Sequence, residues 1–143
     1  MATTIELKPE QLGKESRELA QGGVPVVLSL SAYDIPRSLT ADWDKATSWL
    51  HIRFDYLDQE SPVNRPVDEE LIVQVGKHSG KVLGFLVSPH LKKPKEITIR
   101  IVQGVEQELA RAQRDNQRLN CQLIRNVVSD NMEHLLEDAA YSR

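Results

Sequence analysis

The stretch Trp49-Leu50-His51-Ile52-Arg53-Phe54-Asp55-Tyr56 decides the fold class of this chain. Apolar side chains alternate along this stretch with a second set that includes all of its charged residues. Such a period of two is typical of a half-buried β-strand. The predicted core face consists of Leu50, Ile52, Phe54 and Tyr56. The opposite face carries Trp49, His51, Arg53 and Asp55, and it is a candidate interaction surface.

That second face raises the question of acid–base catalysis, because His51, Arg53 and Asp55 share it. Neighbours on one face of a strand are ~7 Å apart, so an acid–base pair would need a group from another strand. A solvated or partner-facing surface is the simpler interpretation. The sequence therefore assigns no catalytic residue.

Strands are also predicted on both sides of this stretch. Residues 70–75 and 81–87 read as two strands, and the short glycine-flanked connection 76–80 predicts a hairpin between them. Upstream, a short helix over 9–21 precedes a strand over 24–31, while 32–42 and 57–68 are predicted loops. Residues 97–102 are β-branched and alternating, which favours a strand, with the first turns of the next helix as the alternative.

A long helix is predicted over residues 105–139, which contain neither Gly nor Pro. Such a helix would be roughly 50 Å long at 1.5 Å per residue, which is more than a small sheet can cover. Apolar residues recur along it with the alternating spacing of a coiled-coil seam. The predicted interface residues are Val105, Leu109, Ala112, Asn116, Leu119 and Leu123.

Asn116 in that seam favours self-association. An asparagine at a core position can pair with its twin and fix register and strand number, at a cost in stability. We therefore expect a homodimer through this helix, with a different protein as the alternative partner. The predicted fold is α+β, with a short N-terminal helix, an antiparallel sheet of 4–5 strands over 1–103, and the long helix over 104–143 as a separate unit.

Composition limits the remaining classes. The chain has 143 residues, a net charge of −3 and a single cysteine, Cys121, so it predicts one ordinary domain without an internal disulfide. No apolar run approaches the ~20 residues that a membrane span needs. We expect a bacterial cytoplasmic protein without a cofactor.

Residues 43–87 carry a resemblance. Asp44-Lys45-Ala46 precedes the opening stretch, and Val67-Asp68-Glu69-Glu70-Leu71-Ile72-Val73-Gln74-Val75 and Gly80-Lys81-Val82-Leu83-Gly84-Phe85-Leu86-Val87 follow it. This resembles a family of small bacterial domains of unknown function with the pattern D-x-x-x-D-x-L-Y-I-x-F, D-E-x-I-x-V-D, G-K-I-V-G-I-E-I. Ser48 and Leu86 replace the second aspartate and the glutamate of that pattern. The resemblance implies a small antiparallel sheet and no chemistry.

A second similarity concerns the N-terminal region. Residues 12–28, a predicted helix followed by Gly-Gly-Val-Pro-Val-Val-Leu, are similar to the opening of Phd-type antitoxins. Those proteins are dimeric, bind DNA and thread a C-terminal part onto a toxin. The middle of this chain departs from them.

Three other patterns in the sequence have simpler interpretations than a binding site. The glycines of 76–80 are one residue too close for a phosphate loop, and Val82 stands where Ser or Thr would hold magnesium. The acids of 55–60 and 68–70 could gather around a hard cation, but a solvated loop is favoured, and no metal site is assigned. Basic residues could meet phosphates, although acids interleave with them; they are Lys92, Lys93, Lys95, Arg100, Arg111, Arg114, Arg118 and Arg125.

The sequence thus favours a non-enzymatic, homodimeric interaction or assembly protein. The alternative is an antitoxin-like regulator associated with nucleic acid, with contacts from Lys92, Lys93, Lys95, Arg111, Arg114 and Arg118. An enzyme with chemistry around His51 and the acidic loop 57–68 is the third hypothesis.

Overall fold

The computed structural model describes residues 2–7 and 30–140. In these ranges the strands are β1 (Thr3–Glu6), β2 (Ser38–Trp43), β3 (Leu50–Asp55), β4 (Pro62–Pro66), β5 (Leu71–Gly76) and β6 (Val82–Val87). The helices are a short 3-10 turn, η1 (Ala32–Asp34), and the α-helices α2 (Pro94–Arg111) and α3 (Asp115–Ala140). The predicted α+β class is confirmed.

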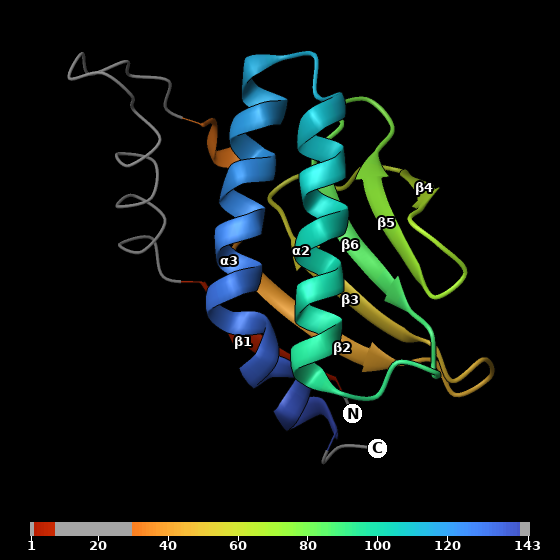
Figure 1. Cartoon of the computed structure of the whole chain (residues 1–143). Coiled ribbons are helices and arrows are strands. Elements are labelled where there is room, and N and C mark those ends of the chain that lie inside the picture. Colours follow the sequence, from red (N-terminus) through yellow and green to blue (C-terminus); the bar gives the residue numbers. More distant parts are fainter. Residues whose placement is uncertain (1, 8–29, 141–143) are drawn as a thin grey trace.

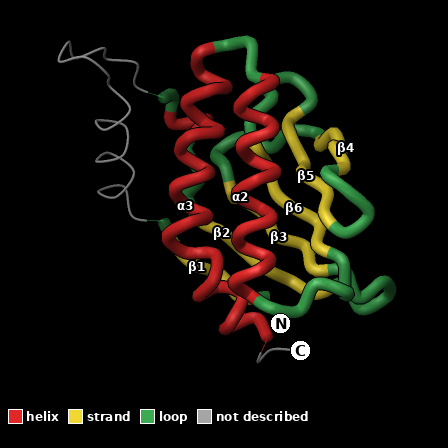
Figure 2. Tube along the Cα trace, in the orientation of Figure 1, coloured by secondary structure: helices red, strands yellow, loops and turns green. Residues whose placement is uncertain are grey.

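The strands form one antiparallel sheet in the order β1-β2-β3-β6-β5-β4. Helices α2 and α3 run antiparallel to each other and lie side by side on the same face of this sheet (Figure 1). Figure 2 shows the same two-layer arrangement of helices over strands. The core lies between the layers, and the other face of the sheet is turned away from both helices.

The predicted core face of β3 is confirmed. Leu50, Ile52, Phe54 and Tyr56 are all buried, and the Phe54 and Phe85 rings meet edge to face with centroids 5.9 Å apart. The predicted hairpin is confirmed as well, because β5 pairs with β6 across the connection 77–81. A register shift between Gln74 and Val75 marks a bulge in that pairing.

The expected number of 4–5 strands is wrong, because the described part of the chain has six. The additional strands are short or polar. β4 lies inside a segment predicted as a loop, and so does β2 except for its last residue, Trp43. Prolines bound β4, where proline is tolerated because this is an edge strand. β1 pairs only with β2 among the described strands.

The helical region also differs from the prediction. Residues 97–102 are helical, because α2 begins at Pro94, whose fixed φ suits the first turn. The single helix over 105–139 is wrong, because the chain leaves the helix at Ala112 (ψ 128°) and restarts at Asp115. Folding back lets both helices bury an apolar face on one sheet, which a continuous helix of ~50 Å could not do.

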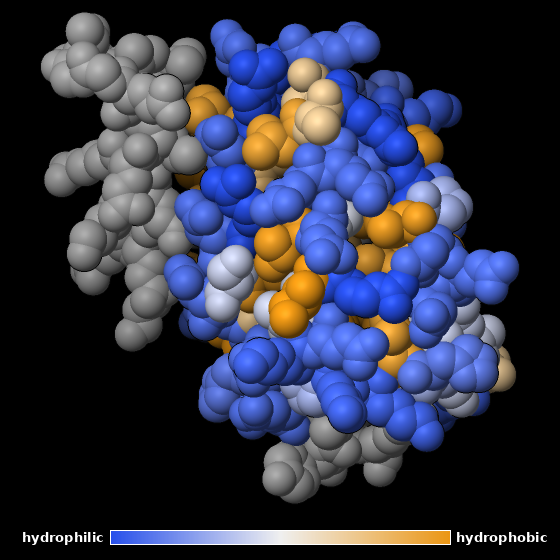
Figure 3. All heavy atoms as spheres, viewed as in Figure 1, coloured by the Kyte–Doolittle hydropathy of each residue, from blue (hydrophilic) through white to orange (hydrophobic). Residues whose placement is uncertain are grey.

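Two predicted elements, the helix over 9–21 and nearly all of the strand over 24–31, lie outside the described residues. The proposed boundary between 103 and 104 falls within α2, which packs with α3 on the sheet. The helix-bearing face is mostly hydrophilic, with small separated hydrophobic patches (Figure 3). Among the described residues, no helix combines the length and apolarity needed to cross a membrane.

Gly84 marks the centre of the sheet, where β3 and β6 join. It pairs with Arg53, and a Cβ atom at this position would lie 2.2 Å from the backbone oxygen of Ile52. Glycine in a strand interior commonly marks such a close backbone approach. The pairing of β3 with β6 therefore depends on Gly84 having no side chain.

Candidate functional site

The predicted helix seam is used inside the chain. Val105 on α2, Ala112 directly after α2 and Leu123 on α3 are buried in this structure, and Leu109 and Leu119 are half-buried against the core. Asn116, by contrast, is exposed in the first turn of α3. The seam residues thus lie on two helices that pack on each other and on the sheet, so most of them are covered without a second chain.

The buried asparagine of α3 is Asn120, one turn after Asn116, and its side chain is 0% exposed. Its Oδ1 accepts a hydrogen bond from the Val82 amide at 2.9 Å. Its Nδ2 donates to the Asp34 carbonyl at 2.9 Å and to the Tyr56 hydroxyl at 3.2 Å. One side chain therefore ties α3 to β6, to the η1 turn and to the end of β3.

Lys81 continues this polar network although it is only 2% exposed. Its Nζ donates to Asp58 Oδ1 at 2.6 Å and to the Tyr33 carbonyl at 2.8 Å. The same ammonium lies 4.5 Å from the centroid of the Tyr56 ring, in a cation–π contact. These contacts stabilise a buried charge and hold two loops against the sheet.

The Tyr56 hydroxyl and the Cys121 thiol of this region are buried and have structural roles. Burial raises the pKa of Tyr56 far above its ordinary value, and its hydroxyl donates to the Val82 carbonyl at 2.6 Å. Burial also raises the pKa of the Cys121 thiol to about 12, and a thiol in that state is a poor nucleophile. Neither group is set up for catalysis.

The second face of β3 is accessible. We define the open face as the side chains of the central strands that point away from α2 and α3. Its members are Thr40 and Asp42 on β2, His51 and Arg53 on β3, Leu86 on β6, and Ile72 and Gln74 on β5. Cross-strand register aligns His51 with Leu86 and Leu86 with Ile72, which makes a row across the sheet.

The residues predicted for this surface behave differently. Asp55 pairs with Arg37 at 2.9 Å, while Arg53 is exposed near the centre of the face. His51 Nε2 lies 3.8 Å from Asp44 Oδ2. Hydrogen bonds from Ala46 and Thr47 hold the pKa of Asp44 below its usual value, so this carboxylate belongs to the turn before β3. Trp49 is half-buried directly before the strand.

The acids considered as a cation site are dispersed. Asp58 pairs with Lys81, and Asp68 and Glu70 both contact Arg100. Within residues 2–7 and 30–140, no three His, Cys, Asp or Glu side chains meet as a group that could hold a metal ion.

Glu60 explains why the turn 76–80 is not a phosphate loop. Its carboxylate accepts hydrogen bonds from the backbone amides of His78 and Ser79 and from the Ser79 hydroxyl. Burial opposes ionisation of Glu60, but these donors and the charge of Lys81 outweigh it and lower the pKa of Glu60. The anion-binding amides of the turn thus already hold a carboxylate from the same chain.

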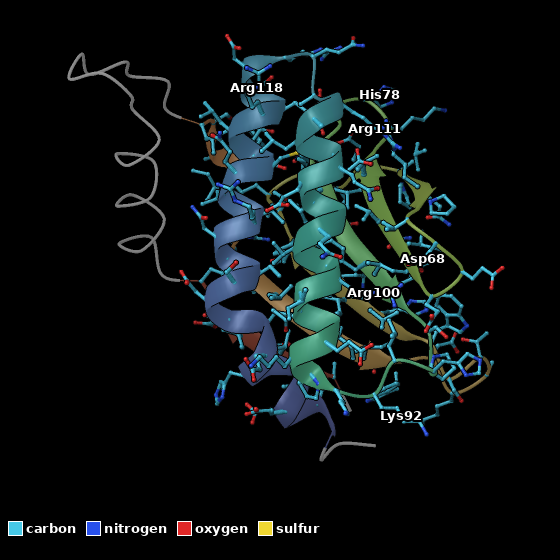
Figure 4. All side chains as sticks on the ribbon, in the orientation of Figure 1. Asp68, His78, Lys92, Arg100, Arg111 and Arg118 are labelled. Carbon is cyan, nitrogen blue, oxygen red and sulfur yellow. The ribbon has the colours of Figure 1, made fainter. Side chains whose placement is uncertain are left out.

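A basic pocket nevertheless lies beside this turn, with a volume of about 560 Å³. Its walls come from β4, from the β5–β6 turn and from the connection between α2 and α3. Figure 4 shows His78 and Arg111 at this end of the molecule. We call this the basic pocket; its charged and amide side chains are Arg65, Lys77, His78, Arg111, Gln113, Arg114 and Gln117.

The structure divides the predicted nucleic-acid contacts. Arg111 and Arg114 line the basic pocket, and Arg118 lies at the same end of the molecule (Figure 4). Lys92, Lys93 and Lys95 lie at the start of α2, at the opposite end. The helix separates the two groups by about 27 Å at 1.5 Å per residue, and Arg100 between them is neutralised by Asp68 and Glu70.

Sequence reasoning missed several residues of these sites. Glu108 is buried and lies three residues after Val105 and four before Ala112, so helical spacing alone could have placed it on the seam face. Arg65 and Lys77 carried no usable signal, because their strand and turn meet the helix connection only in the folded chain.

Comparisons with known proteins add no assignment, since the chain matches no family model, no curated protein and no solved structure. The resemblance of residues 43–87 to a bacterial domain family therefore stays a prediction.

Proposed function

We propose that this protein is a non-enzymatic interaction protein that forms a homodimer through the open face of its sheet. The observation that carries the proposal is the pair Ile72 and Leu86. Both are half-buried neighbours at the centre of that face, and they lie outside the core cluster between sheet and helices. The seam of α2 and α3, being largely covered within the chain, leaves this face as the better candidate for self-association.

The charges around this pair suit a two-fold contact. Arg53 on β3 and Asp42 on β2 lie to one side of this pair and carry opposite charges. In a two-fold interface the same patch meets itself, so an acid of one copy can oppose the arginine of the other. Such complementarity favours a second copy of this chain over an unrelated partner.

The size of the face sets the expected affinity. Six strands ~4.8 Å apart and about six residues long cover roughly 24 by 20 Å. This is below the ~800 Å² per partner of a standard interface, even allowing for side-chain relief. We therefore expect a dimer that dissociates on dilution into the micromolar range.

The test is light scattering coupled to size-exclusion chromatography over a concentration series. The wild-type chain of 16.2 kDa should approach twice that mass at high concentration. Leu86→Glu places a charge in the proposed interface and should yield a monomer. Ile99→Glu is the matched control, because Ile99 is 50% exposed on α2 and outside the open face.

Circular dichroism of each variant would show that the fold is retained. A wild-type monomer at all concentrations would refute the dimer. A dimer that survives Leu86→Glu but dissociates with Ile99→Glu would move the interface to the helices.

A further inference from the structure

We propose that the basic pocket binds a compact polyphosphate group, such as an inorganic or nucleotide triphosphate. The pocket gathers Arg65, Lys77, Arg111 and Arg114 from three separate segments of the chain. Its volume of about 560 Å³ falls within the ~300–1,000 Å³ range of small-molecule sites. This inference is independent of the proposed dimer, which uses the opposite face of the sheet.

Glu108 positions two of the cationic groups. It is 3% exposed, and its carboxylate lies 3.4 Å from Arg65 Nη1 and 3.5 Å from Arg111 Nη1. Its Oε2 is buried and has no hydrogen-bond partner among the described residues. A buried carboxylate held only by such long contacts costs stability, and its effect is to fix one guanidinium on each side of itself.

The guanidinium groups keep most of their donors. Each arginine has five N–H donors in a planar fork, and Glu108 contacts one nitrogen of each. Arg65 and Arg111 both retain solvent-exposed surface. Arginine forks match the geometry of phosphate oxygens and bind them in a bidentate manner.

The remaining wall is cationic or neutral. Lys77 and Arg114 are exposed at the pocket, and Gln113 and Gln117 add amide groups. The nearby turn amides are occupied by Glu60, so recognition would come from side chains. Four cationic side chains therefore line the pocket, and the two carboxylates beside it are Glu108 and Glu60, so the charge of the region stays positive.

The arrangement favours a compact anion over an extended strand. The cations line one cavity instead of forming a track, and Lys92, which precedes α2, lies at the other end of the molecule. No phenylalanine, tyrosine or tryptophan is among the residues that line the cavity, whereas sequence-tolerant binding of single strands relies on aromatic stacking. A triphosphate concentrates its charge in a volume that this cavity can hold.

The test is isothermal titration of the full chain with sodium triphosphate at low and high salt. We expect saturable 1:1 binding that weakens as salt rises, because phosphate contacts release counterions. The double variant Lys77→Glu/Arg114→Glu should lower the affinity at least tenfold. The double variant Lys92→Glu/Lys95→Glu makes the same change in charge at the far end and should stay within twofold of wild type.

Three results would overturn the proposal. They are the absence of binding at millimolar triphosphate, an equal loss in both double variants, and tenfold tighter binding of a ten-nucleotide oligothymidylate than of triphosphate. The last result would indicate a nucleic-acid strand as the ligand. Circular dichroism of both variants shows whether a loss of binding reflects unfolding.

Discussion

Asn120 is the residue whose removal tests the packing of this fold most directly. Asn120→Ala deletes one hydrogen bond to the Val82 amide, one to the Asp34 carbonyl and one to the Tyr56 hydroxyl. The substitution also leaves a cavity, because the side chain is fully buried.

The expected loss follows from the groups left behind. The Val82 amide loses its partner in a buried site, and a buried unsatisfied donor costs about 1–3 kcal/mol. The Asp34 carbonyl is partly buried and adds about 1 kcal/mol. Tyr56 keeps its bond to the Val82 carbonyl, so its share is small. We expect a total of about 2–4 kcal/mol, a large part of the ~5–15 kcal/mol that stabilises a typical domain.

Urea unfolding followed by tryptophan fluorescence measures this loss as a shift in the transition midpoint. Asn120→Leu, of similar volume, should lose nearly as much, because the cost lies in the unsatisfied partners. Ser129→Ala on the exposed side of α3 is the control and should stay within about 0.5 kcal/mol of wild type. A loss below about 1 kcal/mol in both Asn120 variants would refute this account of the network.

Three further predictions concern other contacts. Glu60→Gln should make the free energy of unfolding less sensitive to acid. The pKa of Glu60 in the folded state lies below its ordinary 4.5, so the stability that its carboxylate contributes is present above pH 4.5 and is lost as the pH falls through the lowered value. Unfolding midpoints across pH 3–7 that run parallel to those of wild type would contradict this. Asp58→Ala leaves the buried Lys81 ammonium without its carboxylate and should lower the free energy of unfolding by about 2 kcal/mol. This is less than the ~3–5 kcal/mol of a fully buried pair, because Asp58 is 49% exposed. An unchanged melting temperature would show that the pair contributes nothing to stability. Gly84→Ala forces a Cβ atom against the Ile52 carbonyl and should cost more than about 3 kcal/mol, and a well-folded variant by near-ultraviolet circular dichroism would show that the strands can separate.

The sequence predicted those elements whose local pattern agrees with their final environment. β3 alternates because one face is buried and the other is open, and the β5–β6 hairpin has a glycine-flanked turn. The edge strand β4 is almost entirely exposed, and β1 is only four residues long and alternates between half-buried and exposed positions. Neither strand is long and apolar enough for its pairing to be predicted from the local pattern.

The helices show a different limit. A heptad pattern does not say whether the partner is another chain or the same chain folded back. No Gly or Pro marks the break between α2 and α3 in the sequence. Because of this break, the buried asparagine of α3 is Asn120 and not the predicted Asn116. The sequence predicted only two of the four cationic residues of the basic pocket, Arg111 and Arg114. Arg65 and Lys77 are distant in sequence and join them only in the folded chain.

The strand order carries a consequence for how the protein folds. β1-β2-β3 and β4-β5-β6 are each neighbours in sequence, and of the described pairings only β3–β6 joins strands that are not consecutive. The β2–β3 pair and the β4-β5-β6 meander can therefore assemble from short-range contacts, whereas the β3–β6 and β1–β2 pairings both join residues more than 30 positions apart and must close long loops. Since β1 is a four-residue edge strand, the β3–β6 ladder is the long-range pairing that joins the two locally formed parts. The transition state should be reached when the β3–β6 ladder forms. Substitutions along that ladder are then expected to slow folding, whereas those at the outer edges mainly speed unfolding.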